Sequence, residues 1–198
     1  MYLYLHGFNS SGASAKGRYF TQSLAPFAVH TPTYPPDPEA AMQQLQQTLE
    51  ALLVTAVSDE SIILIGSSLG GFYAQYLAHR YNLPVVLINP ALQPALTLRP
   101  YLGWQTNYYN NARYYFGEAE LATLLHYEVP DPCAGAIPTL VLLDAGDEII
   151  DYRFAQHRYA DCGHVIVYPD GNHQFQHLAE ASAAIRHFRM KLRTSPQI

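Results

Sequence analysis

The residue types that cooperate in nucleophilic catalysis are present in this chain, and a serine is the most distinctive of them. Gly66-Ser67-Ser68-Leu69-Gly70 has the spacing G-x-S-x-G. In a nucleophile elbow of this kind, small flanking residues let the backbone turn sharply and leave the serine oxygen exposed. A bare match also occurs in Gly-rich turns between a strand and a helix, so the neighbouring sequence has to decide. Ser68 is therefore a candidate nucleophile.

The sequence on either side of this pentapeptide favours the catalytic interpretation. The run from Ser61 to Ile65 is mostly aliphatic, which is typical of a strand buried on both faces of a parallel sheet. The following segment, Gly71 to Tyr81, carries its aromatic and aliphatic residues at helical spacing. A strand, a turn and a helix are the setting that the motif requires.

A serine hydroxyl is a poor nucleophile unless a base accepts its proton and a third group orients that base. Asp147 comes just after the predicted strand Thr139–Leu143, and His173 comes just after the predicted strand Val165–Tyr168. The carboxyl ends of parallel strands meet at one edge of a sheet, so both side chains are expected beside Ser68. The order serine, acid, histidine is also one in which such triads occur. The sequence thus predicts a nucleophile, an acid and a base.

Other acids lie close to Asp147 and could take its place. Asp144 is nearer to the strand, whereas Glu148 and Asp151 could begin the next helix, where acids interact favourably with the positive end of the helix dipole. We interpret these three residues as capping or solvated charges.

Several histidines raise the question of a metal ion. His157 with His164, or His173 with His177, could form half of a metal site. Neither pair has a third ligand at a supporting spacing. We therefore expect no metal ion and no cofactor.

Attack on a carbonyl also requires hydrogen-bond donors for the oxyanion. The backbone amide of Leu69, directly after the candidate nucleophile, can supply one donor. The second is expected from the loop His6-Gly7-Phe8-Asn9-Ser10 after the first predicted strand, with the amide of Phe8 as the best candidate. His6 itself is expected to hold this loop by hydrogen bonds rather than to act directly.

Strands and helices alternate along most of the chain, which indicates a doubly wound, mostly parallel sheet of about six strands with its site at the carboxyl ends. The predicted strands are Tyr2–Leu5, Val29–Thr33, Ser61–Ile65, Val85–Ile88, Thr139–Leu143 and Val165–Tyr168. The predicted helices are Ala15–Leu24, a helix capped by Asp37 and opened by Pro38, Gly71–Tyr81, Tyr152–Tyr159, and a last helix from Leu178.

Residues 90–137 break this alternation and are rich in proline and aromatic residues, with a helical turn predicted near Glu118 to Leu125. The aromatic residues are Tyr101, Trp104, Tyr108, Tyr109, Tyr114, Tyr115 and Phe116. We expect a small cap that helps to wall an apolar pocket, although any single ring could simply pack the insertion onto the body. Without a linker or repeat, residues 1–198 are expected to form one domain.

Composition limits the classes of function. The chain has 198 residues, 49% hydrophobic and 14% charged, which argues against disorder. A formal charge of −5 argues against nucleic acid as a partner. The expected substrate is a small molecule that is mostly uncharged, or at least not held by a large basic patch. Lys16 and Arg18 could contact a phosphate-bearing substrate, but solvated surface charges are the preferred interpretation.

The two cysteines and the N-terminus bear on location. Cys133 and Cys162 form no recognisable motif, so we expect reduced thiols. The first residues lack the basic region of a signal peptide, and no apolar stretch is long enough to span a membrane. A cytoplasmic protein is the expectation, and the oligomeric state is left open.

With these residues in place, the chain resembles the α/β-hydrolase superfamily, and more closely the small YqiA/YcfP-like (UPF0227-type) bacterial esterases. The resemblance rests on Tyr4-Leu5-His6-Gly7-Phe8-Asn9-Ser10-Ser11, Gly66-Ser67-Ser68-Leu69-Gly70-Gly71-Phe72-Tyr73-Ala74, Gly146-Asp147-Glu148 and Gly171-Asn172-His173. It covers nearly the whole chain. Relative to larger hydrolases, the chain lacks the antiparallel strands that usually precede the His-Gly strand, which implies a reduced sheet with a short cap.

The resemblance implies a serine esterase that hydrolyses carboxylic esters, including thioesters of acyl-CoA, with Ser68 as nucleophile, His173 as base and Asp147 as acid. An acyltransferase or a C–C hydrolase could use the same triad, because a fold does not fix the bond that is broken. A non-catalytic binding protein on the same fold is a third hypothesis, which the complete set of three residues disfavours.

Overall fold

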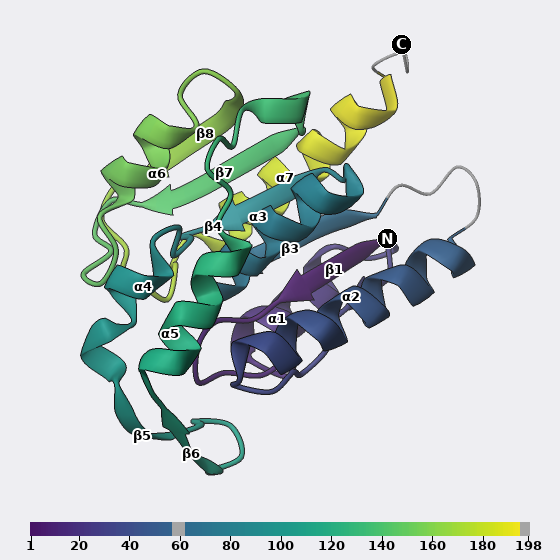
Figure 1. Cartoon of the computed structure of the whole chain (residues 1–198). Helices are drawn as coiled ribbons and strands as arrows, with labels where there is room; N and C mark the ends of the chain where they lie inside the picture. Colours follow the sequence, from purple (N-terminus) through teal and green to yellow (C-terminus); the bar gives the residue numbers. More distant parts are fainter. Residues whose placement is uncertain (57–61, 195–198) are drawn as a thin grey trace.

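A six-stranded parallel sheet forms the centre of the computed structural model, which describes residues 1–56 and 62–194 (Figure 1). The strands lie in the order β2-β1-β3-β4-β7-β8, and each neighbouring pair is parallel. Their bounds are β1 Tyr2–Leu5, β2 Val29–His30, β3 Ile63–Ser67, β4 Val85–Ile88, β7 Thr139–Asp144 and β8 Gly163–Tyr168. The predicted fold class, a doubly wound parallel sheet, is confirmed.

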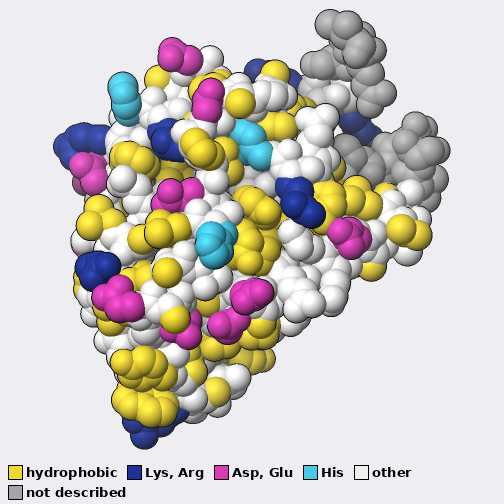
Figure 2. All heavy atoms as spheres, in the orientation of Figure 1, with side chains coloured by type: hydrophobic (Ala, Val, Ile, Leu, Met, Phe, Trp, Pro, Cys, Tyr) yellow, Lys and Arg dark blue, Asp and Glu magenta, His cyan; other side chains and the backbone are white. Residues whose placement is uncertain are grey.

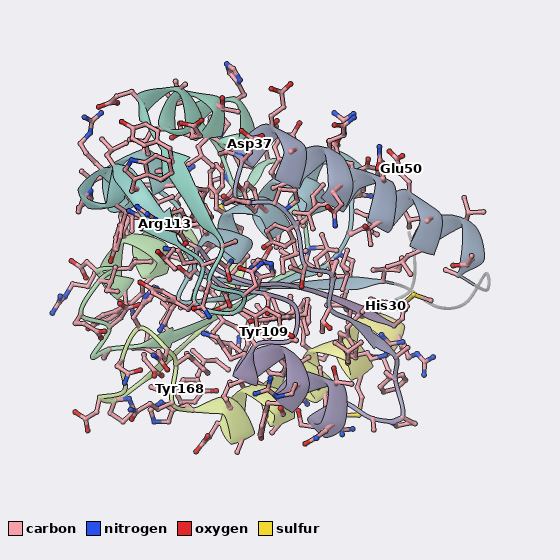
Figure 3. The ribbon with its side chains drawn as sticks, turned by 90° about the horizontal axis from the view of Figure 1, so that it is seen from below. His30, Asp37, Glu50, Tyr109, Arg113 and Tyr168 are labelled. Carbon is pink, nitrogen blue, oxygen red and sulfur yellow. A yellow bond between two sulfur atoms is a disulfide. The ribbon has the colours of Figure 1, made fainter. Side chains whose placement is uncertain are left out.

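Helices cover both faces of the sheet. The bounds are α1 Ala15–Ser23, α2 Pro38–Thr55, α3 Leu69–Tyr81, α4 Pro94–Thr97, α5 Glu118–Leu124, α6 Tyr152–Arg158 and α7 Leu178–Thr194, with 3-10 turns at Arg99–Tyr101, Leu125–Tyr127 and Ala134–Ala136. Seen along the sheet, α2 lies on one side and α1 and α7 lie on the other (Figure 3). In the two described ranges, no helix combines the length and apolarity needed to cross a bilayer.

Alternate residues of the strands pack into two separate cores, as the two-residue period of a strand requires. In β1, Leu3 and Leu5 face the core beneath α2 and α3, whereas Tyr2 and Tyr4 face the core beneath α1 and α7. All four side chains are buried. Burial on both faces explains why the central strands are continuous apolar runs.

Capping residues place the starts of α2 and α6 correctly, whereas α3 begins two residues before the predicted Gly71. The carboxylate of Asp37 accepts a hydrogen bond from the Ala40 amide at 2.8 Å, and Pro38 occupies the first position of α2. In Figure 3, Asp37 marks the beginning of this helix and Glu50 lies in its C-terminal half. Asp151 caps α6 in the same way, as expected for an acid at a helix start.

Strand boundaries differ from the prediction at the edges of the sheet. The second strand ends at His30 instead of Thr33, because Thr33 leaves the sheet and bonds to the amide of Gly12 and the side chain of Gln44. The last strand begins earlier, at Gly163. Ser61, predicted to begin the third strand, lies outside the described residues.

The insertion contains a hairpin that the sequence analysis did not predict. Strands β5, Gly103–Thr106, and β6, Arg113–Phe116, form a separate antiparallel sheet that projects from the lower end of the molecule in Figure 1. Its outward rings, Trp104 and Tyr115, are 66% and 60% exposed. Hydrophobic side chains gather at the lower tip of the molecule in Figure 2. The predicted helical turn is confirmed as α5.

The expectation of reduced thiols is wrong, because Cys133 and Cys162 form a disulfide. Thr139 of β7 pairs with Gly163 of β8, so the segments that enter these two strands lie next to each other. Cys162 directly precedes Gly163, and Cys133 lies in the segment that leads to β7. The 29-residue separation matches no motif, and only the pairing of the two strands brings the sulfurs together.

Candidate active site

Ser68 sits on a sharp turn between β3 and α3. Its backbone has φ 56° and ψ −124°, a conformation that few non-glycine residues adopt. The turn is closed by two glycines with no room for a side chain. A Cβ on Gly66 would lie 2.2 Å from the Gly70 carbonyl oxygen, and a Cβ on Gly70 would lie 2.2 Å from that of Leu5. The glycines of the motif are therefore required by close backbone contact.

The structure brings the predicted serine, histidine and aspartate into one hydrogen-bonded chain. His173 Nε2 lies 3.0 Å from Ser68 Oγ, and His173 Nδ1 lies 2.9 and 3.0 Å from the two carboxylate oxygens of Asp147. Because a carboxylate accepts at Nδ1, we assign the proton to that nitrogen, which leaves Nε2 free to accept from the serine hydroxyl. This is the arrangement that proton transfer from Ser68 requires.

The carboxylate of Asp147 is fixed by its own loop. Oδ1 also accepts the amides of Ile149 and Ile150, each at 2.9 Å. The Asp147 side chain is 1% exposed, whereas that of His173 is 18% exposed. The acid is thus shielded from solvent, and only the imidazole reaches the cavity.

Glu148 holds the backbone of the histidine. Its Oε2 accepts the amide of His173 at 3.0 Å, although the residue was interpreted as a capping or solvated charge. The cap of the next helix is instead Asp151. One signal could have indicated this role of Glu148, namely its position directly after Asp147 at the predicted edge of the site.

Asp144 is not a solvated or capping charge either, since it is fully buried. Its Oδ2 accepts the amides of Gln176 at 2.7 Å and Asn172 at 3.3 Å, and its Oδ1 lies 2.7 Å from Nδ1 of His177. These bonds hold the loop that carries His173 from both sides. The carboxylate of Asp144 thus accepts two backbone amides of the histidine loop from the end of β7, and it does not line the cavity.

Asn89 ties three segments together at the same edge. Its side-chain amide donates to the carbonyl of Asn172 at 3.0 Å, and its side-chain oxygen accepts the amide of Asp144 at 2.9 Å. The end of β4 is thereby joined to the end of β7 and to the histidine loop. No motif or spacing in the sequence indicates this role of Asn89.

The two predicted oxyanion donors lie beside the serine. Phe8 lines the same cavity as Ser68, and Leu69 begins α3. Within the described part of the chain, neither amide donates to another residue. The loop packs tightly against Ser68, because a Cβ on Gly7 would lie 3.2 Å from that of Ser68.

His6 is buried beneath this loop. Its Nδ1 lies 2.9 Å from the Gly7 carbonyl oxygen, and its ring stacks on Tyr34 at 3.9 Å between centroids. Burial lowers the pKa of His6 to about 4, so the ring is neutral near pH 7. These contacts agree with the expected role of His6 as a support of the loop.

A cavity of about 570 Å³ opens in front of the serine and histidine. Much of its wall is apolar, and the insertion contributes Leu98, Tyr101 and Tyr108 to it. Other rings of the insertion have different environments. Phe116 packs on Phe8, with ring centroids 5.2 Å apart, whereas Trp104 projects into solvent. Tyr101 and Tyr108 therefore wall the cavity, as expected of a cap, whereas Phe116 packs the insertion onto the body of the protein.

The hairpin of the insertion is fastened to the predicted oxyanion loop through Asn9. The side-chain oxygen of Asn9 accepts the hydroxyl of Tyr114 at 2.5 Å, and its amide donates to Gln105 at 3.2 Å. Its backbone carbonyl accepts the amide of Tyr108 at 3.1 Å. The insertion thus reaches the candidate site through hydrogen bonds as well as through the cavity wall.

The histidine pairs considered for a metal ion have other partners. His173 faces Asp147, and His177 faces Asp144. Within residues 1–56 and 62–194, no cluster of three or more His, Cys, Asp or Glu side chains is placed to hold a metal ion.

Comparison with solved structures gives the same fold throughout. Est1E from Butyrivibrio proteoclasticus, solved with bound ferulic acid, superposes with a TM-score of 0.75 at 13% identity over 96% of this chain and 88% of that one. The mouse alpha/beta hydrolase domain-containing protein 10 superposes with a TM-score of 0.70 at 18% identity, over 96% of this chain and 90% of that one. A pyrethroid hydrolase from Sphingobium faniae superposes with a TM-score of 0.65 at 16% identity, over 94% of this chain and 96% of that one. At these identities the likeness shows the fold alone. A family model described as "Uncharacterised protein family (UPF0227)" matches residues 1–190.

Proposed function

The chain belongs to the family described as Uncharacterised protein family (UPF0227), and from that premise we propose that it is a serine hydrolase of carboxylic esters. One observation carries the proposal: Ser68, strained on its turn, shares a hydrogen-bonded chain with His173 and Asp147. Strained backbone persists where the surrounding structure enforces it, and it gathers at active sites. The esterases and hydrolases among the structural neighbours support the same class of reaction.

In the first half of the reaction, His173 Nε2 accepts the hydroxyl proton while Ser68 Oγ attacks the ester carbonyl carbon. Asp147 stabilises the resulting imidazolium, and the amides of Phe8 and Leu69 donate to the oxyanion. The tetrahedral intermediate collapses when the bond to the leaving oxygen breaks and His173 returns the proton to that oxygen. An alcohol leaves, and the acyl group stays on Ser68.

In the second half, His173 removes a proton from water, and the hydroxide attacks the acyl-enzyme. Collapse of this second intermediate returns the proton to Ser68 and releases the acid. The net reaction is ester plus water to acid plus alcohol. A thioester of acyl-CoA would follow the same steps with a thiol as the leaving group, so both classes belong in the substrate panel.

The cavity supports a small-molecule substrate with an apolar part. Its volume of about 570 Å³ lies within the usual range for small-molecule sites, and Phe8, Tyr101 and Leu178 contribute apolar surface beside the serine. The cap-like insertion at residues 90–137 belongs to the same proposed domain and supplies part of this wall.

The test compares Ser68→Ala with the wild type on aryl esters and acyl-CoA thioesters of increasing acyl length. We expect kcat to fall by about 10⁵-fold or more, because the histidine and aspartate cannot act without a nucleophile. The wild type should also be labelled at Ser68 by a fluorophosphonate, whereas Ser68→Ala should not.

Ser67→Ala is the matched control, since it removes a hydroxyl one residue away. The Ser67 hydroxyl is buried and makes no hydrogen bond to another described residue, so its removal should preserve turnover. Substantial ester turnover by a folded Ser68→Ala protein would contradict the proposal. Turnover that requires an added alcohol acceptor would instead indicate an acyltransferase.

A further inference from the structure

We propose that Lys16 recognises a carboxylate on the leaving alcohol of the substrate, so that the preferred esters are O-acyl derivatives of hydroxy acids. This inference rests on the proposed esterase function and narrows its substrate class. It follows from where the Lys16 ammonium lies and from which half of an ester must lie there.

Lys16 has the only Lys or Arg side chain among the described residues that line the cavity. Its Nζ donates to the carbonyl of Gln174 at 3.1 Å. An ammonium carries three donors, so two remain for other acceptors. Arg18, two residues further along the same helix, is exposed and bonds to the Ala13 carbonyl instead. Both residues were interpreted as surface charges, but Lys16 lines the cavity and Arg18 does not.

The surroundings of Lys16 make an anionic partner favourable. Burial lowers its pKa to about 8, and the attraction of Asp147 and then Asp144 opposes that shift. Both aspartates lie behind the cavity wall and already accept several hydrogen bonds. The other titratable groups of the lining are His173, Glu148 and the tyrosines Tyr4, Tyr101 and Tyr108. Glu148 accepts the amide of His173, and the His173 ring faces Ser68. A substrate carboxylate would replace solvent at a cation that is partly desolvated.

The position of Lys16 selects the leaving-group half of the ester. His173 must return its proton to the leaving oxygen, so the alcohol has to lie on the side of the imidazole. Lys16 donates to the carbonyl of Gln174, the residue directly after His173, so its ammonium lies at the loop that carries the imidazole, and we assign it to the leaving-group side. The carboxylate should therefore be close to the scissile oxygen, as in a hydroxy acid. The distant phosphates of a CoA leaving group would lie too far along the chain for this contact.

The experiment measures kcat/KM for two matched esters, 3-acetoxybenzoate and 3-acetoxybenzamide, which differ in the charge of the leaving group. We expect Lys16→Gln to lower the ratio of the first value to the second by about 10-fold, which corresponds to about 1.4 kcal/mol. Glutamine keeps a donor for the Gln174 carbonyl but removes the charge. Lys16→Arg should restore the ratio. Intrinsic reactivity cancels because the same two esters are compared in every variant.

Arg18→Gln is the matched control, because it removes the same charge from the same helix outside the cavity. An equal loss in this variant would show a general effect of net charge and would overturn the proposal. A second pair, the phenyl monoesters of succinic and succinamic acid, carries the difference on the acyl half. A Lys16 effect confined to that pair would overturn the leaving-group assignment.

The experiment distinguishes failure of the Lys16 proposal from failure of the esterase proposal. If the wild type hydrolyses both esters and the ratio is the same in Lys16→Gln, only the role of Lys16 is refuted. If Lys16→Gln does not fold, product inhibition of the wild type decides: 3-hydroxybenzoate should inhibit about 10-fold more tightly than 3-hydroxybenzamide, and equal inhibition would refute the proposal. If no ester is turned over, the esterase function itself fails.

Discussion

Removing the carboxylate of Asp144 should destabilise the protein and misplace His173, the proposed catalytic base. Asp144 is fully buried and is the common acceptor for the amides of Asn172 and Gln176 and for the ring of His177. In Asp144→Ala these donors lose their partner while the protein around them excludes water. A hydrogen bond to a charged acceptor contributes about 1.5 to 3 kcal/mol, and a buried donor left without a partner costs about 1 to 3 kcal/mol.

The contributions are not additive within one network, so we expect a loss of about 4 kcal/mol in the free energy of unfolding rather than the sum of three bonds. For a protein of this length, such a loss lowers Tm by about 8 to 16 °C. Urea unfolding followed by circular dichroism measures the free energy, and a thermal scan measures Tm. Asp144→Asn keeps the volume and one acceptor, so its loss should be smaller.

The same variant should impair catalysis, because Asn172 and Gln176 flank the histidine on its loop. A displacement of about 1 Å at the reacting groups can lower kcat by about 100-fold, and we expect a loss of that size with little change in KM. Asp151→Ala is the control: it removes an exposed acid that caps α6, which should cost about 1 kcal/mol and leave kcat unchanged.

Two results would refute this reasoning separately. If Asp144→Ala unfolds within about 1 kcal/mol of the wild type, the hydrogen bonds to the buried carboxylate do not contribute as argued. If stability falls as expected but kcat is retained below the new Tm, Asp144 supports the fold without positioning His173.

Three other predictions follow from the site. Gly70→Ala should lower the free energy of unfolding by about 3 kcal/mol in urea titration and abolish turnover, because its Cβ would lie 2.2 Å from the Leu5 carbonyl oxygen. Tyr114→Phe should lower stability by about 1 kcal/mol and reduce kcat several-fold in the same ester assay, because it removes the hydroxyl bond to Asn9. The preference for the charged ester should decline as pH rises through about 8, where Lys16 loses its proton, whereas Lys16→Arg should keep the preference constant to pH 10. Wild-type stability and turnover in Gly70→Ala or in Tyr114→Phe would contradict the first or the second prediction. A wild-type preference that does not change with pH would contradict the third.

The parts of the site that could be predicted from sequence are those fixed by local patterns. The elbow needs closely spaced glycines around Ser68, and the strand before it is an uninterrupted apolar run. Asp147 and His173 could be placed because parallel strands end at one edge of the sheet, so residues that directly follow such strands lie near one another. For the same reason the order of elements was sufficient to predict a parallel sheet.

The parts that could not be predicted depend on contacts between distant segments. The pairing of Cys133 with Cys162 follows from the neighbouring starts of β7 and β8, which no spacing in the sequence encodes. The role of Asp144 was misjudged because burial, which decides whether an acid is solvated, depends on the loop that folds over it. The hairpin was missed because β6 carries aromatic residues on both faces, which obscures the alternation expected of a half-buried strand, and β5 is only four residues long.

Both loops that bear on the proposed chemistry are held by asparagines, for a physical reason. Asn9 donates and accepts through one side chain to bind the hairpin, and Asn89 does the same between Asp144 and Asn172. Both have positive φ, 54° and 40°, a region that asparagine tolerates better than most residues. An aspartate would keep the backbone but lose the donor, and a leucine would lose both donor and acceptor. The geometry of Ser68 and His173 therefore depends on two amide side chains that need not touch the substrate.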